Sequence, residues 1–245
     1  MNLGNLKGLE ELYLSGTTIK ELPSSVEGMT ALPFLTLLDF KNLVYLPSTI
    51  GSLKLLECLD LSGCSNCDKL PENLGNLKGL EELHFSGTSI KELPSSIEGL
   101  KSLTFLTLGD CKNVVCLPST ICSLKFLECV DLSRCSNYGN LPENLGNHKG
   151  LENLYLSGTT IKELPSSIEG LTALTFLTLK DFKNLVCLHS TILRIFGCSN
   201  YDNLPENREN LKGLKKLYLS GTSIKELPSS IERLTALTFL TLKDC

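Results

Sequence analysis

The most constraining feature of this sequence is a repeat that runs along nearly its whole length. The stretch "LEELYL" begins at position 9, "LEELHF" at 80 and "LENLYL" at 151, an interval of 71 residues each time. Within the first interval the pattern L-x-x-L-x-L begins again at 32 and 56, so the units are 23 or 24 residues long. Such units stack on one another, because one unit alone cannot bury its apolar side chains.

Each unit combines a short strand with a short arc. The leucines of L-x-x-L-x-L alternate, which predicts a strand that buries them on one face. A segment such as "ELPSSIEGL" (92–100) follows, where Pro suits the start of a helical turn and Gly its end. Units of this length and pattern are leucine-rich repeats. We therefore expect an α/β fold: a leucine-rich-repeat solenoid, or horseshoe, with one parallel concave sheet of about eleven short strands and short 3-10 or irregular turns on the convex side.

We expect residues 1–245 to form a single leucine-rich-repeat domain. Its units start near positions 9, 32, 56, 80, 103, 127, 151, 174, 193, 214 and 237. One unit is truncated near 189–198, because "ICSLKFLECVDLSRCSN" (121–137) becomes "ILRIFGCSN" (192–200). This predicts a short strand at 193–198 and a local gap in the outer layer. No polar cap is visible at either end, so we expect exposed leucines and poor solubility when the chain is expressed alone.

Composition excludes several classes of protein. The formal net charge is −4 and no Lys/Arg cluster suggests binding to nucleic acid or membrane. No apolar run approaches the length of a membrane span, and "MNLGNLKG" (1–8) lacks the apolar region of a signal peptide. The 11 cysteines are odd in number, and no Asn-x-Ser/Thr acceptor occurs. These features predict reduced thiols and a cytoplasmic location.

One position of the repeat, three residues after the second strand leucine, faces the turn. Small side chains dominate there, and Thr and Cys can still donate weakly to a neighbouring carbonyl. The series is Thr17, Phe40, Cys64, Thr88, Cys111, Cys135, Thr159, Phe182, Cys198, Thr222 and Cys245. Five of the cysteines are thereby predicted to be structural.

The pattern L-x-x-L-x-L-x-x-C-x-x-L-x-x-L-P-x-x-I-x-x-L is carried almost intact by "LTFLTLGDCKNVVCLPSTICSL" (103–124). It resembles the leucine-rich-repeat region of plant nucleotide-binding disease resistance proteins. "LSGTTIKELPSSIEGLTALTFLTLKD" (156–181) is similar to the class with a Toll/interleukin-1-receptor-type N-terminal domain. The resemblance covers essentially the whole chain. It implies intracellular recognition of a pathogen effector or guarded host protein, and restraint of an attached nucleotide-binding domain.

Two functions remain open, and neither is enzymatic. The first is the ligand-sensing and autoinhibitory repeat region of such a receptor, acting in the defense response. The second is a free-standing leucine-rich-repeat scaffold for signalling proteins. No G-x-x-x-x-G-K-[ST] loop occurs, so nucleotide binding cannot reside in these residues. The missing caps favour the receptor region.

The side chains that could act as nucleophiles or metal ligands are better explained by their positions in the repeat, so we expect no catalytic, cofactor-binding or metal-binding residues. "CSNC" (64–67) has the spacing of a redox or zinc motif, but its counterpart at 135 is "CSNY". Cys58 and Cys129 should face the concave side with His84 nearby, which makes a thiol nucleophile conceivable. His148 and Arg208 stand at core positions and should lean out to water. His189, in the place of a Pro, is interpreted as a tolerated change.

The residues between the strand leucines point to the concave side and form the candidate protein-binding surface. Aromatic residues there suit the centre of an interface, or else pack on one another across strands. The charges are acidic in the first part and basic in the rest, which predicts a gradient that guides a partner of opposite polarity. The candidates are Glu11, Tyr13, Phe34, Asp60, Glu82, His84, Phe105, Asp131, Tyr155, Phe176, Lys180, Arg194, Lys216, Tyr218, Phe239 and Lys243; Phe196 completes the aromatic set.

Overall fold

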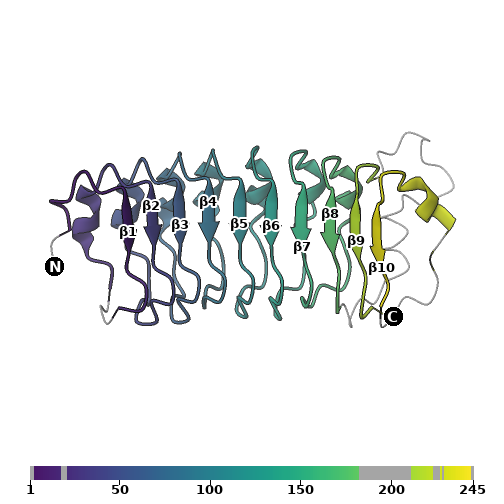
Figure 1. Cartoon of the computed structure of the whole chain (residues 1–245), viewed down its shortest axis with the longest axis horizontal. Helices are drawn as coiled ribbons and strands as arrows, with labels where there is room; N and C mark the ends of the chain where they lie inside the picture. The colour runs from purple at the N-terminus through teal and green to yellow at the C-terminus, as the bar shows by residue number, and fades with distance from the viewer. Residues whose placement is uncertain (1–2, 18–20, 182–210, 223–226, 228, 244–245) are drawn as a thin grey trace.

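The computed structural model describes residues 3–17, 21–181, 211–222, 227 and 229–243, and shows a solenoid of stacked coils (Figure 1). Each described coil contributes one three-residue strand to a single sheet. The strands are β1 (Glu11–Tyr13), β2 (Phe34–Thr36), β3 (Cys58–Asp60), β4 (Glu82–His84), β5 (Phe105–Thr107), β6 (Cys129–Asp131), β7 (Asn153–Tyr155), β8 (Phe176–Thr178), β9 (Lys216–Tyr218) and β10 (Phe239–Thr241).

The sheet is parallel throughout, and its strands lie in chain order from β1 to β10. Equivalent residues of successive repeats pair: Cys58 lies beside Glu82, and Asp60 lies beside His84. This register follows from the repeat, because each coil brings the chain back to the same position along the strand direction before the next strand begins. The expected parallel sheet is confirmed.

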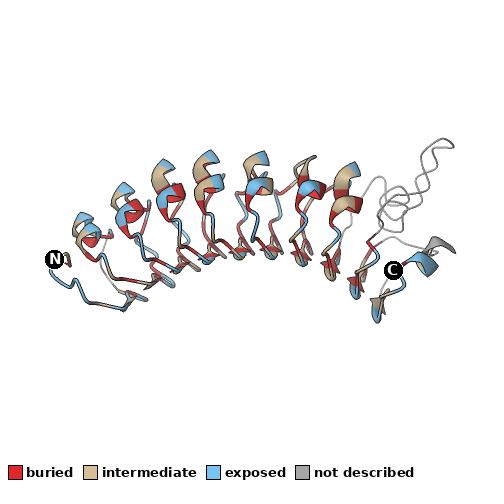
Figure 2. Cartoon of the chain, turned by 90° about the horizontal axis from the view of Figure 1, so that it is seen from above, coloured by how far each residue is buried: buried red, intermediate tan, exposed pale blue. Residues whose placement is uncertain are grey.

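Short 3-10 helices line the opposite side of the solenoid, so the sheet is concave and the helices are convex (Figure 2). Most begin directly after a proline in extended conformation, such as Pro94 with φ −64° and ψ 148°. They are η1 (Ser24–Gly28), η2 (Ser48–Ser52), η3 (Glu72–Asn76), η4 (Ser95–Gly99), η5 (Ser119–Ser123), η6 (Leu145–Asn147), η7 (Ser166–Gly170) and η8 (Ser229–Arg233). The short convex turns are therefore also confirmed.

The core is a continuous ribbon between sheet and helices. It contains the strand leucines, such as Leu83 at the centre of β4, and the apolar residue of each arc, such as Ile97 in η4; both are fully buried. Because each coil covers the next, burial is complete in the middle of the solenoid and weaker at its ends. Leu237 and Leu240 in the last coil are only partly buried.

The turn position occupied by Thr and Cys closes the coils against one another. The Sγ atoms of Cys64, Cys111 and Cys135 each lie 3.0 Å from a backbone carbonyl oxygen of the preceding coil, to which the thiol donates. The Thr159 hydroxyl donates to the carbonyl oxygen of Leu156 at 2.9 Å. The predicted weak donation is confirmed for these positions, so these thiols have a structural role.

The expected strand at 193–198 lies outside the described residues. Within the described sheet β8 pairs directly with β9, and Phe176 lies beside Lys216. Direct pairing leaves no place for another strand between them, because the Lys215 and Lys216 amides both donate to the Thr175 carbonyl oxygen, at 2.8 and 3.0 Å. The truncated unit itself, 189–198, lies outside the described residues.

Candidate functional site

The outward residues of the strands form two parallel columns along the concave face. The middle residue of each strand packs into the core, fully buried in β2 to β9 and partly buried in β1 and β10, while the first and third residues lie on the other face of the sheet. The first column contains Glu11, Phe34, Glu82, Phe105, Phe176, Lys216 and Phe239. The second contains Tyr13, Asp60, His84, Asp131, Tyr155 and Tyr218. Lys180 and Lys243 lie two residues after their strands. All of these candidates are exposed or half-buried; Arg194 and Phe196 lie outside the described residues.

Charge along this face is separated by sign. Glu11, Asp60, Glu82 and Asp131 come from β1 to β6, whereas Lys180, Lys216 and Lys243 belong to the coils of β8 to β10. The two aspartates are held in place, because Oδ1 of each accepts the backbone N–H two residues later at 2.8 Å. The described charges of the candidate surface therefore change from acidic to basic in the order of the strands.

Four aromatic rings form a ladder on the basic half. Centroids of successive rings are 4.8 Å apart for Tyr155 and Phe176, 5.2 Å for Phe176 and Tyr218, and 4.9 Å for Tyr218 and Phe239. The Lys180 Nζ lies 5.2 Å from the Tyr218 ring centroid, within range of a cation–π interaction. The sequence left open whether the aromatic residues serve an interface or pack on one another across strands. These four rings do pack on one another. Tyr155, Phe176 and Tyr218 are half-buried, and Phe239 is 44% exposed.

The aromatic residues of the acidic half are more exposed. Tyr13 is 63% exposed, Phe34 41% and Phe105 38%. The neighbouring Glu11 carboxylate raises the pKa of Tyr13. These three side chains give the acidic half an apolar component that the solenoid itself does not cover.

A compact polar cluster lies where β3 meets β4. The His84 Nε2 atom is 3.2 Å from Glu82 Oε2, and the His84 Nδ1 atom is 3.1 Å from Thr107 Oγ1. One ligand atom each of Cys58, Glu82 and His84 lies within 4.8 Å of the other two. The sequence places His84 near Cys58, but it does not indicate that Glu82 joins them. The sequence signal that could have indicated this cluster is a strand with the pattern Glu-x-His in the repeat directly after a strand that begins with Cys.

The thiol-nucleophile hypothesis conflicts with the electrostatics of this cluster. Burial, followed by the negative charges of Glu82 and Asp60, raises the pKa of Cys58 to about 11. Burial and the Asp131 carboxylate do the same for Cys129. An activated nucleophile requires the opposite shift, because the thiolate is the reactive form. The arrangement does not activate either thiol.

The remaining chemical candidates belong to the core. Cys64 and Cys67 of the "CSNC" stretch are fully buried, and Tyr138 fills the same core position 71 residues after Cys67. His148 corrects our expectation that it leans out to water: it is 4% exposed, and its Nε2–H donates to the Leu124 carbonyl oxygen at 2.5 Å. Burial lowers the pKa of His148. Arg208 and His189 lie outside the described residues.

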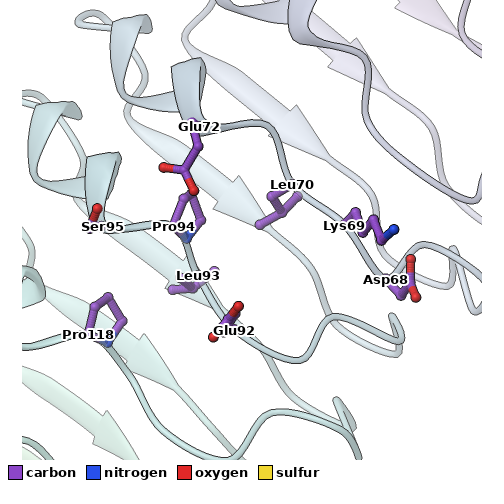
Figure 3. Close-up of a pocket in the computed structure, with 9 residues that line it drawn as sticks. All are labelled: Asp68, Lys69, Leu70, Glu72, Glu92, Leu93, Pro94, Ser95 and Pro118. Carbon is purple, nitrogen blue, oxygen red and sulfur yellow. The ribbon is translucent and has the colours of Figure 1, made fainter.

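A shallow depression lies between successive coils on the flank of the solenoid (Figure 3). It has a volume of about 430 Å³ and is lined by Asp68, Lys69, Leu70, Glu72, Glu92, Leu93, Pro94, Ser95 and Pro118. Charges of both signs and prolines alternate around it, and no group of catalytic or ligand-binding side chains converges there. The concave face therefore remains the candidate site. Within the described part of the chain, no helix is both long and apolar enough to cross a membrane.

These features define a solenoid that presents a broad, chemically varied sheet face. The chain belongs to the leucine-rich-repeat family: the family model described as "Leucine-rich repeat region" matches residues 1–85 and 58–140, and a second, "Leucine Rich Repeat", matches 213–234. The resemblance to plant disease resistance proteins is confirmed by curated relatives. TMV resistance protein N of Nicotiana glutinosa is 39% identical over 171 residues, which cover 65% of this chain and 15% of that protein.

A second relative, disease resistance protein RPS6 of Arabidopsis thaliana, is 39% identical over 107 residues, covering 44% of this chain and 9% of that protein. This chain therefore spans only a small fraction of the relatives it matches. Among solved structures, a leucine-rich-repeat protein of Leptospira interrogans superposes with a TM-score of 0.71 at 28% identity, over 99% of this chain and 68% of that one. The Arabidopsis receptor kinase HAESA, solved with the peptide hormone IDA and the co-receptor SERK1, has a TM-score of 0.63 at 23% identity, over 98% of this chain and 43% of that one, and shows the fold alone.

Proposed function

We propose that this chain is a non-enzymatic protein–protein recognition module, the ligand-sensing and autoinhibitory repeat region of an intracellular plant immune receptor of the Toll/interleukin-1-receptor-type class. Its partners are a pathogen effector or a guarded host protein and, in the full-length receptor, its own nucleotide-binding domain. Its location is cytoplasmic, and neither nucleic acid nor membrane is a partner. The similarity to TMV resistance protein N and RPS6 supports the class of receptor.

The observation that carries this proposal is the polarity of the concave face. Acidic residues from Glu11 to Asp131 lie in strands β1 to β6, whereas Lys216 lies in β9 and Lys180 and Lys243 lie two residues after β8 and β10. A partner with a basic and an acidic end gains attraction in one orientation and repulsion in the other. Such complementarity mainly raises the association rate and fixes the register of binding.

The aromatic ladder supplies the apolar part of the surface. Tyr155, Phe176, Tyr218 and Phe239 hold one another at centroid distances of 4.8 to 5.2 Å, so little side-chain entropy is lost when a partner covers them. Aromatic residues, Tyr among them, are enriched in the hot spots of protein interfaces. The basic half should therefore contribute most of the affinity, and the acidic half should contribute orientation.

The test begins with the location of the partner. A photo-cross-linking residue replaces Phe105 on the concave face, and a control chain carries it at Ser52 in η2 on the convex side. Both chains are expressed in plant tissue. We expect a partner protein that cross-links through position 105 and not through position 52. Equal cross-linking from both faces contradicts a concave recognition surface.

Charge reversal then tests the gradient on the partner so identified. The double substitution Lys216→Glu and Lys243→Glu should slow association several-fold and weaken its salt dependence, leaving the far-ultraviolet circular dichroism unchanged. The matched control, Lys101→Glu and Lys125→Glu, makes the same change in net charge at exposed residues that follow η4 and η5. Unchanged association of the first variant, or equal slowing in both, refutes the gradient.

A free-standing scaffold for signalling proteins is the alternative, and genomic sequence separates the two. A receptor region is encoded next to a nucleotide-binding segment with a G-x-x-x-x-G-K-[ST] loop. A scaffold is encoded with its own polar capping repeats. The DNA upstream of the Met1 codon should therefore contain the loop, and polar caps in its place would favour the scaffold.

A further inference from the structure

The cluster at β3 and β4 brings together three side chains that the repeat alone does not require. Cys58 opens β3, and Glu82 and His84 open and close β4. The register pairs Cys58 with Glu82, so both project from the same face of adjacent strands. Their ligand atoms, with that of His84, lie within 4.8 Å of one another, and Glu82 Oε2 is 3.2 Å from His84 Nε2.

We propose that Cys58, Glu82 and His84 form a binding site for Zn²⁺ or a divalent cation of similar size and softness on the concave face. Thiolate sulfur, imidazole nitrogen and carboxylate oxygen are each donors that Zn²⁺ binds in proteins. Ligand atoms about 2.0 to 2.3 Å from a tetrahedral metal lie roughly 3 to 4 Å from one another. The atoms here lie within 4.8 Å of one another, and Glu82 Oε2 and His84 Nε2 are already at such a separation, 3.2 Å.

Thr107 on β5 is suited to position the imidazole. Its Oγ1 atom lies 3.1 Å from His84 Nδ1 and can accept a hydrogen bond from Nδ1–H. That tautomer leaves the lone pair of Nε2 directed at Glu82, where a cation would sit. Metal-binding histidines usually donate their other ring N–H to such a partner, which fixes the tautomer and the ring orientation. Thr107 is therefore a positioning residue.

The negative charge around Cys58 favours the binding of a cation at this place. The Glu82 and Asp60 carboxylates place negative charge near the Cys58 sulfur, and this charge would attract a divalent cation. Binding exchanges the Cys58 S–H bond for a sulfur–metal bond, and the proton leaves to solvent. The imidazole remains neutral and the Glu82 carboxylate remains ionised. Three protein ligands leave a fourth position open toward the concave side, for water or for a donor atom of a bound protein.

The chain contains its own comparison for this site. Cys129 opens β6 as Cys58 opens β3, but its register partner is Asn153, and Tyr155 takes the place of His84. Thr178 occupies the position of Thr107. At the position of His84 the other copies of this strand carry Tyr13, Tyr155 and Tyr218. Among the described residues, Cys58, Glu82 and His84 are the group whose ligand atoms converge.

The experiment titrates the reduced full chain with Co²⁺ and with Zn²⁺. Binding of Co²⁺ to a thiolate produces a near-ultraviolet charge-transfer band, and competition with a chromophoric chelator gives the Zn²⁺ affinity and stoichiometry. We expect Cys58→Ser and His84→Tyr each to remove one bound equivalent or to weaken it at least about tenfold, and Thr107→Val to weaken it about tenfold. The Cys129→Ser control should bind like the parent chain. Because the His84→Tyr variant carries the residue of the other copies, it should fold.

A gain of function completes the test. The double substitution Asn153→Glu and Tyr155→His rebuilds the cluster beside Cys129, with Thr178 already in place, and should add a second equivalent of Co²⁺ with its own thiolate band. If the parent chain, Cys58→Ser and His84→Tyr take up Co²⁺ equally, the metal binds to other thiols or not at all, and the proposal is wrong. In that case the contact between Glu82 and His84 is a hydrogen bond without a metal. Neither outcome decides the proposed protein recognition.

Discussion

At the scale of single residues, His148 shows how one departure from the repeat is accommodated. The leucine at the equivalent position 71 residues earlier, Leu77, is fully buried, and His148 lies in the same place at 4% exposure. Its Nε2–H bonds to the Leu124 carbonyl oxygen, which leaves Nδ1 without a hydrogen-bond partner. An unsatisfied buried polar atom costs about 1 to 3 kcal/mol.

We expect His148→Leu to raise the free energy of unfolding by about 1 to 2 kcal/mol at pH 7, since it restores the apolar core and removes the unsatisfied nitrogen. The Leu124 carbonyl oxygen keeps the backbone N–H of Leu127 at 3.4 Å. Burial lowers the pKa of His148 in the folded state, so the unfolded chain takes up the proton first as the pH falls below about 6.5. The advantage of the variant should therefore grow below that pH. Urea denaturation of both proteins at pH 7.5 and 5.5 checks this, and parallel pH profiles contradict it.

At the scale of elements, the convex side depends on close contact between successive 3-10 helices. Gly75 in η3 lies against η4, and a Cβ atom at this position would overlap the Ser96 carbonyl oxygen. Glycine permits this approach because it has no side chain. The convex arcs therefore stack through their backbones, which sets the spacing of the coils on the side away from the sheet.

Gly75→Ala should lower the free energy of unfolding by about 1 to 3 kcal/mol, because the two backbones must separate to admit the methyl group. Gly79→Ala is the matched control, since the nearest atom to its added Cβ would be the Lys54 carbonyl oxygen at 3.6 Å. We expect the control to change stability by no more than about 0.5 kcal/mol. Urea titration followed by circular dichroism measures both, and equal effects would remove the special role of Gly75.

At the scale of the whole molecule, the ends of the solenoid differ from its middle. Leu83 and Leu106 in the central strands are fully buried, whereas Leu240 in β10 is only partly buried and Leu6 is 46% exposed. The outer edges of β1 and β10 also have no neighbouring strand among the described residues. Exposed leucines beside an open edge favour association between chains.

A chain of these 245 residues should therefore self-associate as its concentration rises. Addition of a polar capping coil after residue 245 should increase the monomer fraction and the melting temperature, because it covers Leu240 and Leu242 and pairs with β10. Light scattering over a concentration series, with and without the cap, measures the effect. A stable monomer of the uncapped chain would contradict this expectation.

The sequence by itself determined the solenoid, its parallel sheet and the side chains on the concave face. A repeat of 23 or 24 residues with alternating leucines is local information, and stacking equivalent units repeats the same register at every step. The charge gradient followed directly, because every second strand residue points to the same side. As a surface that guides a partner, the gradient stays a prediction.

Only the tertiary structure decided the features that depend on which coils become neighbours. Direct pairing of β8 with β9 brings Phe176 within 5.2 Å of Tyr218, although the sequence places another unit between them. The side chains of Glu82 and His84 turn toward Cys58, and His148 turns into the core rather than out to water. The periodicity of the sequence cannot predict these outcomes. They depend on how particular side chains pack and on which strand pairing leaves the fewest backbone N–H and C=O groups without a hydrogen bond.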